Sequence, residues 1–131
     1  MSIIRPINAS VKGAMPRLRV LNATASGLIA NGGSTQSFYH EYGMSLVQVA
    51  LQTINGSALQ ASSTVTVYGS LNDQDYDQLT TITITANGTQ SRAANHSTLS
   101  GVWPYLIVTA TNIGANAQMG VWAQPVAGNL N

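Results

Sequence analysis

Apolar and polar side chains alternate with a period of two along several short segments of the chain. The pattern covers residues 18–22, 45–52, 64–68 and 81–85, where Val, Ile and Thr are frequent. Successive side chains of a β-strand point to opposite faces, so this alternation predicts strands with one buried face. The residues predicted to face inward are Val47, Val49, Leu51, Val65, Val67, Ile82, Ile84, Tyr105, Ile107 and Val121.

Two further segments, and the turns between all of them, complete an all-β pattern. Residues 105–109 are apolar on both faces, which is typical of a central strand, and residues 119–123 form the last strand. Gly and Asn tolerate positive φ, and the turns that they predict are Asn31-Gly32-Gly33, Asn55-Gly56, Gly69-Ser70, Asn87-Gly88 and Asn112-Ile113-Gly114. The best helical candidate, residues 91–95, is short. The sequence therefore predicts an antiparallel β-sandwich with jelly-roll or Greek-key connections.

The N-terminal residues do not follow this pattern. Pro6, Gly13 and Pro16 exclude a regular helix, so we expect an extended arm over residues 1–17 and a single β-sandwich domain over residues 18–131. Four of the five cations, and no acid, lie within the first 19 residues. The side chains expected to contact a partner or a neighbouring subunit are Ile3, Ile4, Arg5, Ile7, Lys12, Arg17 and Arg19. The alternative is a frayed terminus.

A low content of charged residues narrows the classes of function. Charged residues make up 7% of the 131 residues, and the formal net charge is +1. Because Cys is absent, a disulfide framework, a cysteine-ligated zinc site and a thiol nucleophile are excluded. Five cations release few counterions, so we expect no nucleic-acid partner. Neither a signal peptide nor a long apolar run is visible, so we expect synthesis in the cytoplasm and no membrane partner.

Three carboxylates stand at alternate positions, at Asp73, Asp75 and Asp77. This spacing is similar to the start of a calcium-binding loop, in which oxygen ligands converge on one ion. The rest of an EF-hand pattern is missing, because Gln78 replaces the glycine of its sixth position and Ile84 replaces the glutamate of its twelfth. A solvated polar turn is therefore the favoured interpretation, and the three aspartates are a weak candidate for a metal site.

Few other residues could carry chemistry. His40, Glu41 and His96 are the remaining groups of catalytic type, but nothing in the sequence brings them together, and no Gly-x-Ser-x-Gly motif is present. Exposed aromatic residues could form a platform for a sugar, and the candidates are Tyr39 with Tyr42 and Trp103 with Tyr105. The alternative for these aromatic residues is packing in the core and at strand ends.

An ordered set of motifs lies between Thr64 and Trp122. The motifs are Tyr68-Gly69-Ser70-Leu71-Asn72-Asp73, then Tyr76-Asp77-Gln78-Leu79, and, after a polar crossover, Gly101-Val102-Trp103-Pro104-Tyr105-Leu106-Ile107-Val108. This order resembles small β-sandwich domains of tailed-bacteriophage virion proteins, in which a Gly-Ser corner is followed by an aromatic residue and later by a Pro-Tyr strand. Similar corners occur in discoidin-like and carbohydrate-binding sandwiches. The chain departs from the phage pattern after Tyr105, where Leu and Ile stand in place of a frequent Arg.

The resemblance implies a structural role, and the composition agrees with one. Virion proteins of this size are often capsid decoration, or cement, proteins, which bind as oligomers over an assembled shell. A nearly uncharged surface suits a protein that its neighbours cover, because little charge repulsion would keep free monomers apart. We therefore expect a decoration protein on the virion surface, without enzymatic activity or cofactor. Its expected partners are the major capsid protein and further copies of itself, with a homotrimer implied by the resemblance. The alternatives are a head-fibre, tail or baseplate module and a carbohydrate-binding or adhesin module.

Overall fold

The computed structural model describes residues 24–126, and all its regular elements are β-strands. They are β1 (Thr24–Ala25), β2 (Ile29–Ala30), β3 (Phe38–Thr53), β4 (Ser62–Ser70), β5 (Asp77–Thr85), β6 (Arg92–Asn112) and β7 (Ala117–Pro125). Every pairing between them is antiparallel, so the all-β antiparallel prediction is confirmed. No helix in this part of the chain is long and apolar enough to cross a membrane. The predicted arm, residues 1–17, and the segment 18–22 lie outside the described residues.

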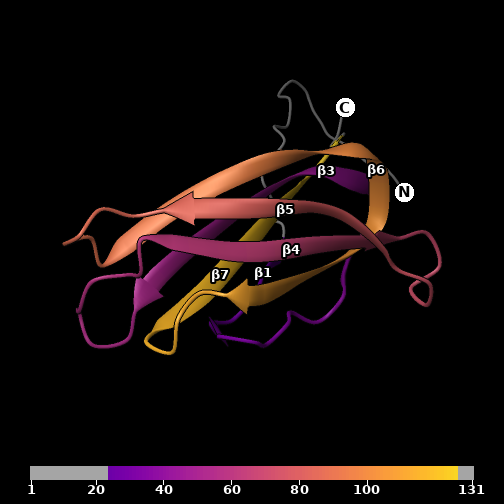
Figure 1. Cartoon of the computed structure of the whole chain (residues 1–131). Coiled ribbons are helices and arrows are strands. Elements are labelled where there is room, and N and C mark those ends of the chain that lie inside the picture. The colour runs from indigo at the N-terminus through magenta and orange to yellow at the C-terminus, as the bar shows by residue number, and fades with distance from the viewer. Residues whose placement is uncertain (1–23, 127–131) are drawn as a thin grey trace, which may run out of the picture.

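One continuous hydrogen-bonded sheet contains all seven strands, in the order β1-β7-β3-β6-β4-β5, with β2 also paired to β7. The first half of β6 pairs with β3, from Arg92 opposite Gln52 to Thr98 opposite Leu46. Its second half pairs with β4, up to Asn112 opposite Thr64. Because β6 bends between these halves, the sheet folds over on itself into two layers (Figure 1). The jelly-roll or Greek-key connection stays a prediction.

The bend requires unusual backbone conformations in both strands that cross it. Gly101 has a φ of 90° in β6, and Gly43 has a φ of 79° in β3. Residues with a Cβ rarely adopt such angles, so glycine relieves the strain at both positions. The pairing of β3 with β6 also shifts register on each side of Met44. These irregularities let β3 begin beside the second half of β6, with Tyr39 opposite Tyr105, and then continue beside the first half.

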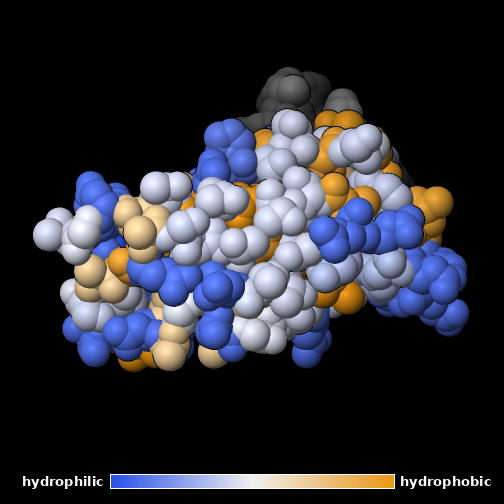
Figure 2. Space-filling view, viewed as in Figure 1, coloured by the Kyte–Doolittle hydropathy of each residue, from blue (hydrophilic) through white to orange (hydrophobic). Residues whose placement is uncertain are grey.

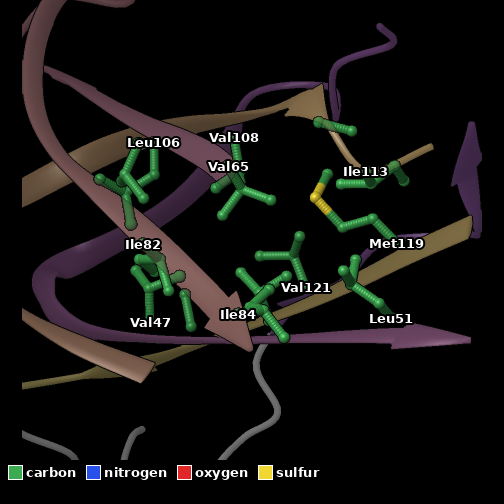
Figure 3. Close-up of a cluster of buried hydrophobic side chains, with 14 of the residues drawn as sticks. Val47, Leu51, Val65, Ile82, Ile84, Leu106, Val108, Ile113, Met119 and Val121 are labelled. Atoms are coloured by element: carbon green, nitrogen blue, oxygen red, sulfur yellow. The ribbon is translucent and has the colours of Figure 1, made fainter. Parts of the chain in front are cut away.

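The hydrophobic core fills the space between the two layers (Figure 3). The side chains that were predicted to face inward and are buried are Val47, Val49, Leu51, Val65, Val67, Ile82, Ile84 and Val121. Met119 and Ile113 extend the core towards the end of the molecule opposite the bend. The alternation of polar and apolar residues therefore identified the buried face of β3, β4, β5 and β7 correctly.

Three local predictions are wrong. Tyr105 and Ile107 were predicted to face inward but are only partly buried. Leu106, which lies between them, and Val108, which follows Ile107, are fully buried. A segment that is apolar on both faces has no preferred phase, and the bend that precedes it sets which face turns inward. Of the best helical candidate, residues 91–95, all but the first belong to the strand β6, and the predicted turn at Gly69-Ser70 is the last part of β4.

Replacing Ile84 with alanine tests the position of the core. Ile84 is fully buried on β5, so the Ile84→Ala variant leaves a cavity and should lower the free energy of unfolding by about 2–5 kcal/mol. Thr85→Ala, on the exposed face of the same strand, is the matched control and should change stability by less than about 0.5 kcal/mol. Urea unfolding measures both values. Equal stabilities for the two variants would contradict the assignment of the inner face.

Candidate interaction surface

Large exposed apolar side chains gather at the end of the molecule where β6 bends. Tyr39, Tyr42, Val102 and Val126 are 57%, 54%, 49% and 51% exposed. Together with Tyr105, they are called the bend-end patch below. Apolar residues are visible at this end in the space-filling view (Figure 2). Such a concentration of exposed aromatic and aliphatic groups is a candidate interaction surface.

Contacts across the bend hold these side chains beside one another. The rings of Tyr39 and Tyr105 lie 4.9 Å apart between centroids, with an angle of 41° between their planes. Val102 occupies the space where a side chain at position 43 would stand. The Val126 amide donates a hydrogen bond of 2.9 Å to the Gly43 carbonyl. The patch is therefore built from β3, β6 and the end of β7.

The aromatic residues do not pack in the pairs that the sequence suggested, Tyr39 with Tyr42 and Trp103 with Tyr105. Tyr39 packs against Tyr105, whereas the ring of Tyr42 lies beside His40, at 5.7 Å between centroids. Trp103 is partly buried against the core, and its Nε1 donates a hydrogen bond of 2.9 Å to the Ser100 carbonyl. Trp103 is therefore a packing residue, and the exposed aromatic surface belongs to the tyrosines.

A polar loop next to the patch, residues 71–76, is held by its own side chains. Ser70 Oγ accepts hydrogen bonds from the amides of Asn72 and Asp73, at 3.1 and 2.9 Å. Asn72 Oδ1 accepts hydrogen bonds from the amides of Gln74 and Asp75. Asp73 adopts a φ of 61°, a left-handed conformation that Asp and Asn tolerate better than most residues. The loop is thus a set of turns stabilised by short polar side chains.

The carboxylate of Asp73 connects this loop to the segment that leads into β3. Its Oδ1 accepts hydrogen bonds from the hydroxyls of Tyr76 and Ser37. These two bonds favour the ionised form, so they lower the pKa of Asp73 below its ordinary value of 3.8. Partial burial and the bond to Asp73 raise the pKa of Tyr76. The ionised Asp73 therefore fixes the loop beside the bend-end patch.

The three aspartates do not converge on a common point. Asp75 accepts a hydrogen bond of 2.9 Å from the Asn72 side chain, and Asp77 begins β5 opposite Gly69. Among residues 24–126, no group of three or more His, Cys, Asp or Glu side chains could hold a metal ion. The geometry of this loop is that of a turn held by its own polar side chains.

The other residues of catalytic type lie on different parts of the sheet. His40 is at the bend, where its Nδ1 accepts a hydrogen bond of 3.2 Å from the Tyr42 amide. His96 is in the first half of β6 opposite Gln48, beyond the register shifts that separate this region from His40. The structure does not bring the two histidines and Glu41 together.

Both ends of the described chain lie at the bend. Thr24, the first described residue, pairs with Ala123 near the end of β7, and Val126, the last, bonds to Gly43. The four acids of the sequence, Glu41, Asp73, Asp75 and Asp77, are near the same end. The first 19 residues carry four cations, so a basic segment joins the domain where its acids are concentrated.

Comparison with known proteins adds no assignment. No protein-family model, no curated protein and no solved structure matches this chain. The resemblance to domains of phage virion proteins therefore rests on the motifs between Thr64 and Trp122 alone.

The Asp73 carboxylate should make the stability of the protein depend on pH. Its pKa is lowered in the folded state, so its hydrogen bonds contribute stability above pH 3.8, and this contribution is lost as the pH falls through the lowered pKa. We expect Asp73→Asn to have a lower Tm than the wild type at pH 7, and the difference to narrow at about pH 2.5. Asparagine also tolerates a positive φ, so this change removes the charge without straining the backbone.

Asp77→Asn is the matched control, because the Asp77 carboxylate makes no side-chain hydrogen bond within the described part of the chain. Its Tm should stay close to that of the wild type at pH 7. A difference for Asp73→Asn that is as large at about pH 2.5 as at pH 7 would show that the charge of Asp73 has no part in holding the loop.

Proposed function

We propose that this chain is a structural virion protein, a capsid decoration protein that binds the assembled head of a tailed bacteriophage and stabilises it. The bend-end patch is the observation that supports this proposal. Tyrosines and aliphatic side chains are exposed there, and a rim of polar and acidic residues lies beside them. Protein interfaces commonly have this arrangement, with aromatic residues at the centre and polar groups around them.

The patch is suited to contact with another protein. Tyr39 and Tyr42 each expose more than half of their surface, and aromatic residues of this kind often contribute most of the energy of an interface. A standard interface buries about 800 Å² on each partner. Each contact would add interface area between a shell subunit and the decoration protein.

Low charge supports assembly with further copies of the chain. Between residues 24 and 126, Glu41, Asp73, Asp75, Asp77 and Arg92 are the charged residues. Little electrostatic repulsion therefore opposes contact between copies, and self-association is expected. A homotrimer is the proposed form, and this number rests on the resemblance to phage proteins.

The charge of the N-terminal residues complements that of the bend end. Arg5, Lys12 and Arg17 belong to the proposed arm, whereas the acids lie near the bend. In an assembly, the arm of one copy would reach the acids of a neighbour or an acidic region of the shell. Ile3 and Ile4 would add apolar contacts that offset part of the entropy lost when the arm is ordered.

A carbohydrate-binding module is the second candidate function that an observation favours. The exposed ring of Tyr39 beside Tyr105 could contact a sugar. The angle of 41° between the two rings prevents them from forming one flat platform. The bend-end patch therefore favours contact with a protein over stacking against an extended glycan.

Removing tyrosine rings from the bend-end patch tests the proposed function. The double variant Tyr39→Ala/Tyr42→Ala should bind at least tenfold more weakly to heads that lack the protein, because buried aromatic anchors contribute about 1.4 kcal/mol or more. Co-sedimentation with heads of the phage that encodes the chain measures the affinity. Ile54→Ala is the matched control, because Ile54 is equally exposed but follows β3 at the opposite end.

Binding of the double variant at the affinity of the wild type would exclude the bend end as the docking surface. If the wild-type protein itself does not bind heads or any other part of the particle, the decoration function is wrong.

A further inference from the structure

One layer is formed by β7, β3 and the first half of β6. Its outer face carries a second surface, separate from the bend-end patch. On this face, Trp122 of β7 lies opposite Gln48 of β3, which in turn lies opposite His96 of β6. Their neighbours Val121 and Val49 point into the core, so these three side chains point outward. The next row consists of the small residues Gly120, Ala50 and Ala94. An indole and two polar groups therefore border a row with little side-chain volume.

Gly120 provides the space in which the indole of Trp122 lies. A Cβ at position 120 would be 3.0 Å from Cη2 and 3.3 Å from Cζ3 of this ring. Gly120 does not have a positive φ, so its backbone conformation does not require glycine. The absence of a side chain at this position lets the six-membered ring pack over the strand, and Trp122 remains 38% exposed.

A hollow of about 320 Å³ lies beside this ring. Its lining residues are Leu46, Gln48, His96, Trp122, Ala123 and Gln124. The lining combines apolar surface with a few polar groups, as is typical of ligand sites, although this one is shallow. Among the described residues, its lining includes no Asp, Glu, Lys or Arg. A charged ligand would therefore lose its hydration here without gaining an ion pair.

Some glutamine side chains in the described part of the chain already have hydrogen-bond partners. The side chain of Gln52 accepts a hydrogen bond from Arg92, and that of Gln60 donates to the Ser62 and Asn112 carbonyls. Gln48 and Gln124 make no such side-chain bond within residues 24–126. A glutamine amide offers both donors and an acceptor. These two amides are thus available to a ligand.

We propose that this hollow binds a neutral saccharide. The exposed face of the Trp122 indole would pack against the apolar face of a sugar ring, and the amides of Gln48 and Gln124 would bond to its hydroxyls. A hydroxyl both donates and accepts hydrogen bonds, which matches the two functions of an amide. A nucleotide or an acidic sugar fits less well, because no Lys or Arg among the described lining residues would pair with its negative charge. This site is independent of the proposed docking through the bend end.

Titration of the full chain with neutral oligosaccharides tests the site. The probes are hexamers of α-linked and β-linked glucose, a galactose tetramer and an N-acetylglucosamine tetramer. The NMR signal of the Trp122 indole should shift in a saturable way with at least one probe, with a Kd between about 0.1 and 10 mM. The signal of Trp103, which is partly buried against the core, should stay in place. Binding should change little with salt, because the described lining residues include no Asp, Glu, Lys or Arg.

Three variants separate the contributions of the lining. Trp122→Ala should weaken binding at least tenfold, and Gln48→Ala should weaken it without affecting the position of the indole. Gly120→Ala should also weaken binding, because the added Cβ displaces the ring by a few tenths of an ångström or more. Tyr39→Ala is the matched control at the bend end and should bind the saccharide like the wild type.

Three outcomes would overturn the proposed saccharide site. If no probe binds at about 10 mM, the hollow is not a saccharide site. If binding survives Trp122→Ala but is lost in Tyr39→Ala, the sugar site is at the bend end. If Trp122→Ala abolishes self-association and no probe binds, the face is an interface between copies. Binding of Trp122→Ala to phage heads is measured in parallel. If this binding is retained, the loss of the saccharide site leaves the proposed decoration function intact.

Discussion

The packing of Trp103 against Gly69 holds the two layers together at the bend. A Cβ at position 69 would lie 2.8 Å from Cδ2 of the indole and 2.6 Å from Cδ1 of Leu79, so only a glycine leaves room for both side chains. The Nε1 of Trp103 reaches back to the Ser100 carbonyl across Gly101, which has the positive φ of the bend. The indole therefore joins β6, where the strand changes layer, to β4 and β5. This contact acts together with the core side chains between the layers in fixing the angle between the two halves of the sheet.

The same bend produces the candidate interaction surface. It brings Tyr105 of β6 beside Tyr39 of β3, and it directs Val102 outward over Gly43. It also places the polar loop that contains Asp73 beside the segment that leads into β3. The core and the bend-end patch thus depend on one structural feature. A sheet that stayed flat would expose its apolar face and would separate the tyrosines.

The sequence predicted the strands best where their two faces differ. Val47, Val49 and Ile82 alternate with polar residues, so the burial of one face follows from the pattern alone. The first half of β6 was not predicted, because its residues are polar or small on both faces. Asn95 explains part of this composition, since its side chain donates a hydrogen bond to the Thr83 carbonyl of β5 and requires no apolar partner.

The site could be predicted only in part. The aromatic residues were recognised as candidates, but the contact between Tyr39 and Tyr105 joins distant parts of the chain and depends on the bend. A solvated polar turn was favoured over a metal site because Gln78 and Ile84 break the EF-hand pattern. The hydrogen bonds that hold the loop, from Ser70 and Asn72, were not predicted. The hollow beside Trp122 gave no local signal, since it arises from three strands in register.

Replacing Gly69 with alanine tests most directly whether the sheet depends on this packing. Gly69 has no positive φ, so the Gly69→Ala change adds only a methyl group, which must displace Trp103 or Leu79. Gly88→Ala is the control, because a Cβ at position 88 has no neighbour within 4 Å. Equilibrium unfolding followed by tryptophan fluorescence should show Gly69→Ala destabilised by about 1–3 kcal/mol, with altered native fluorescence, and Gly88→Ala little changed. A Gly69→Ala protein with wild-type stability and fluorescence would contradict the central role of the Trp103 contact.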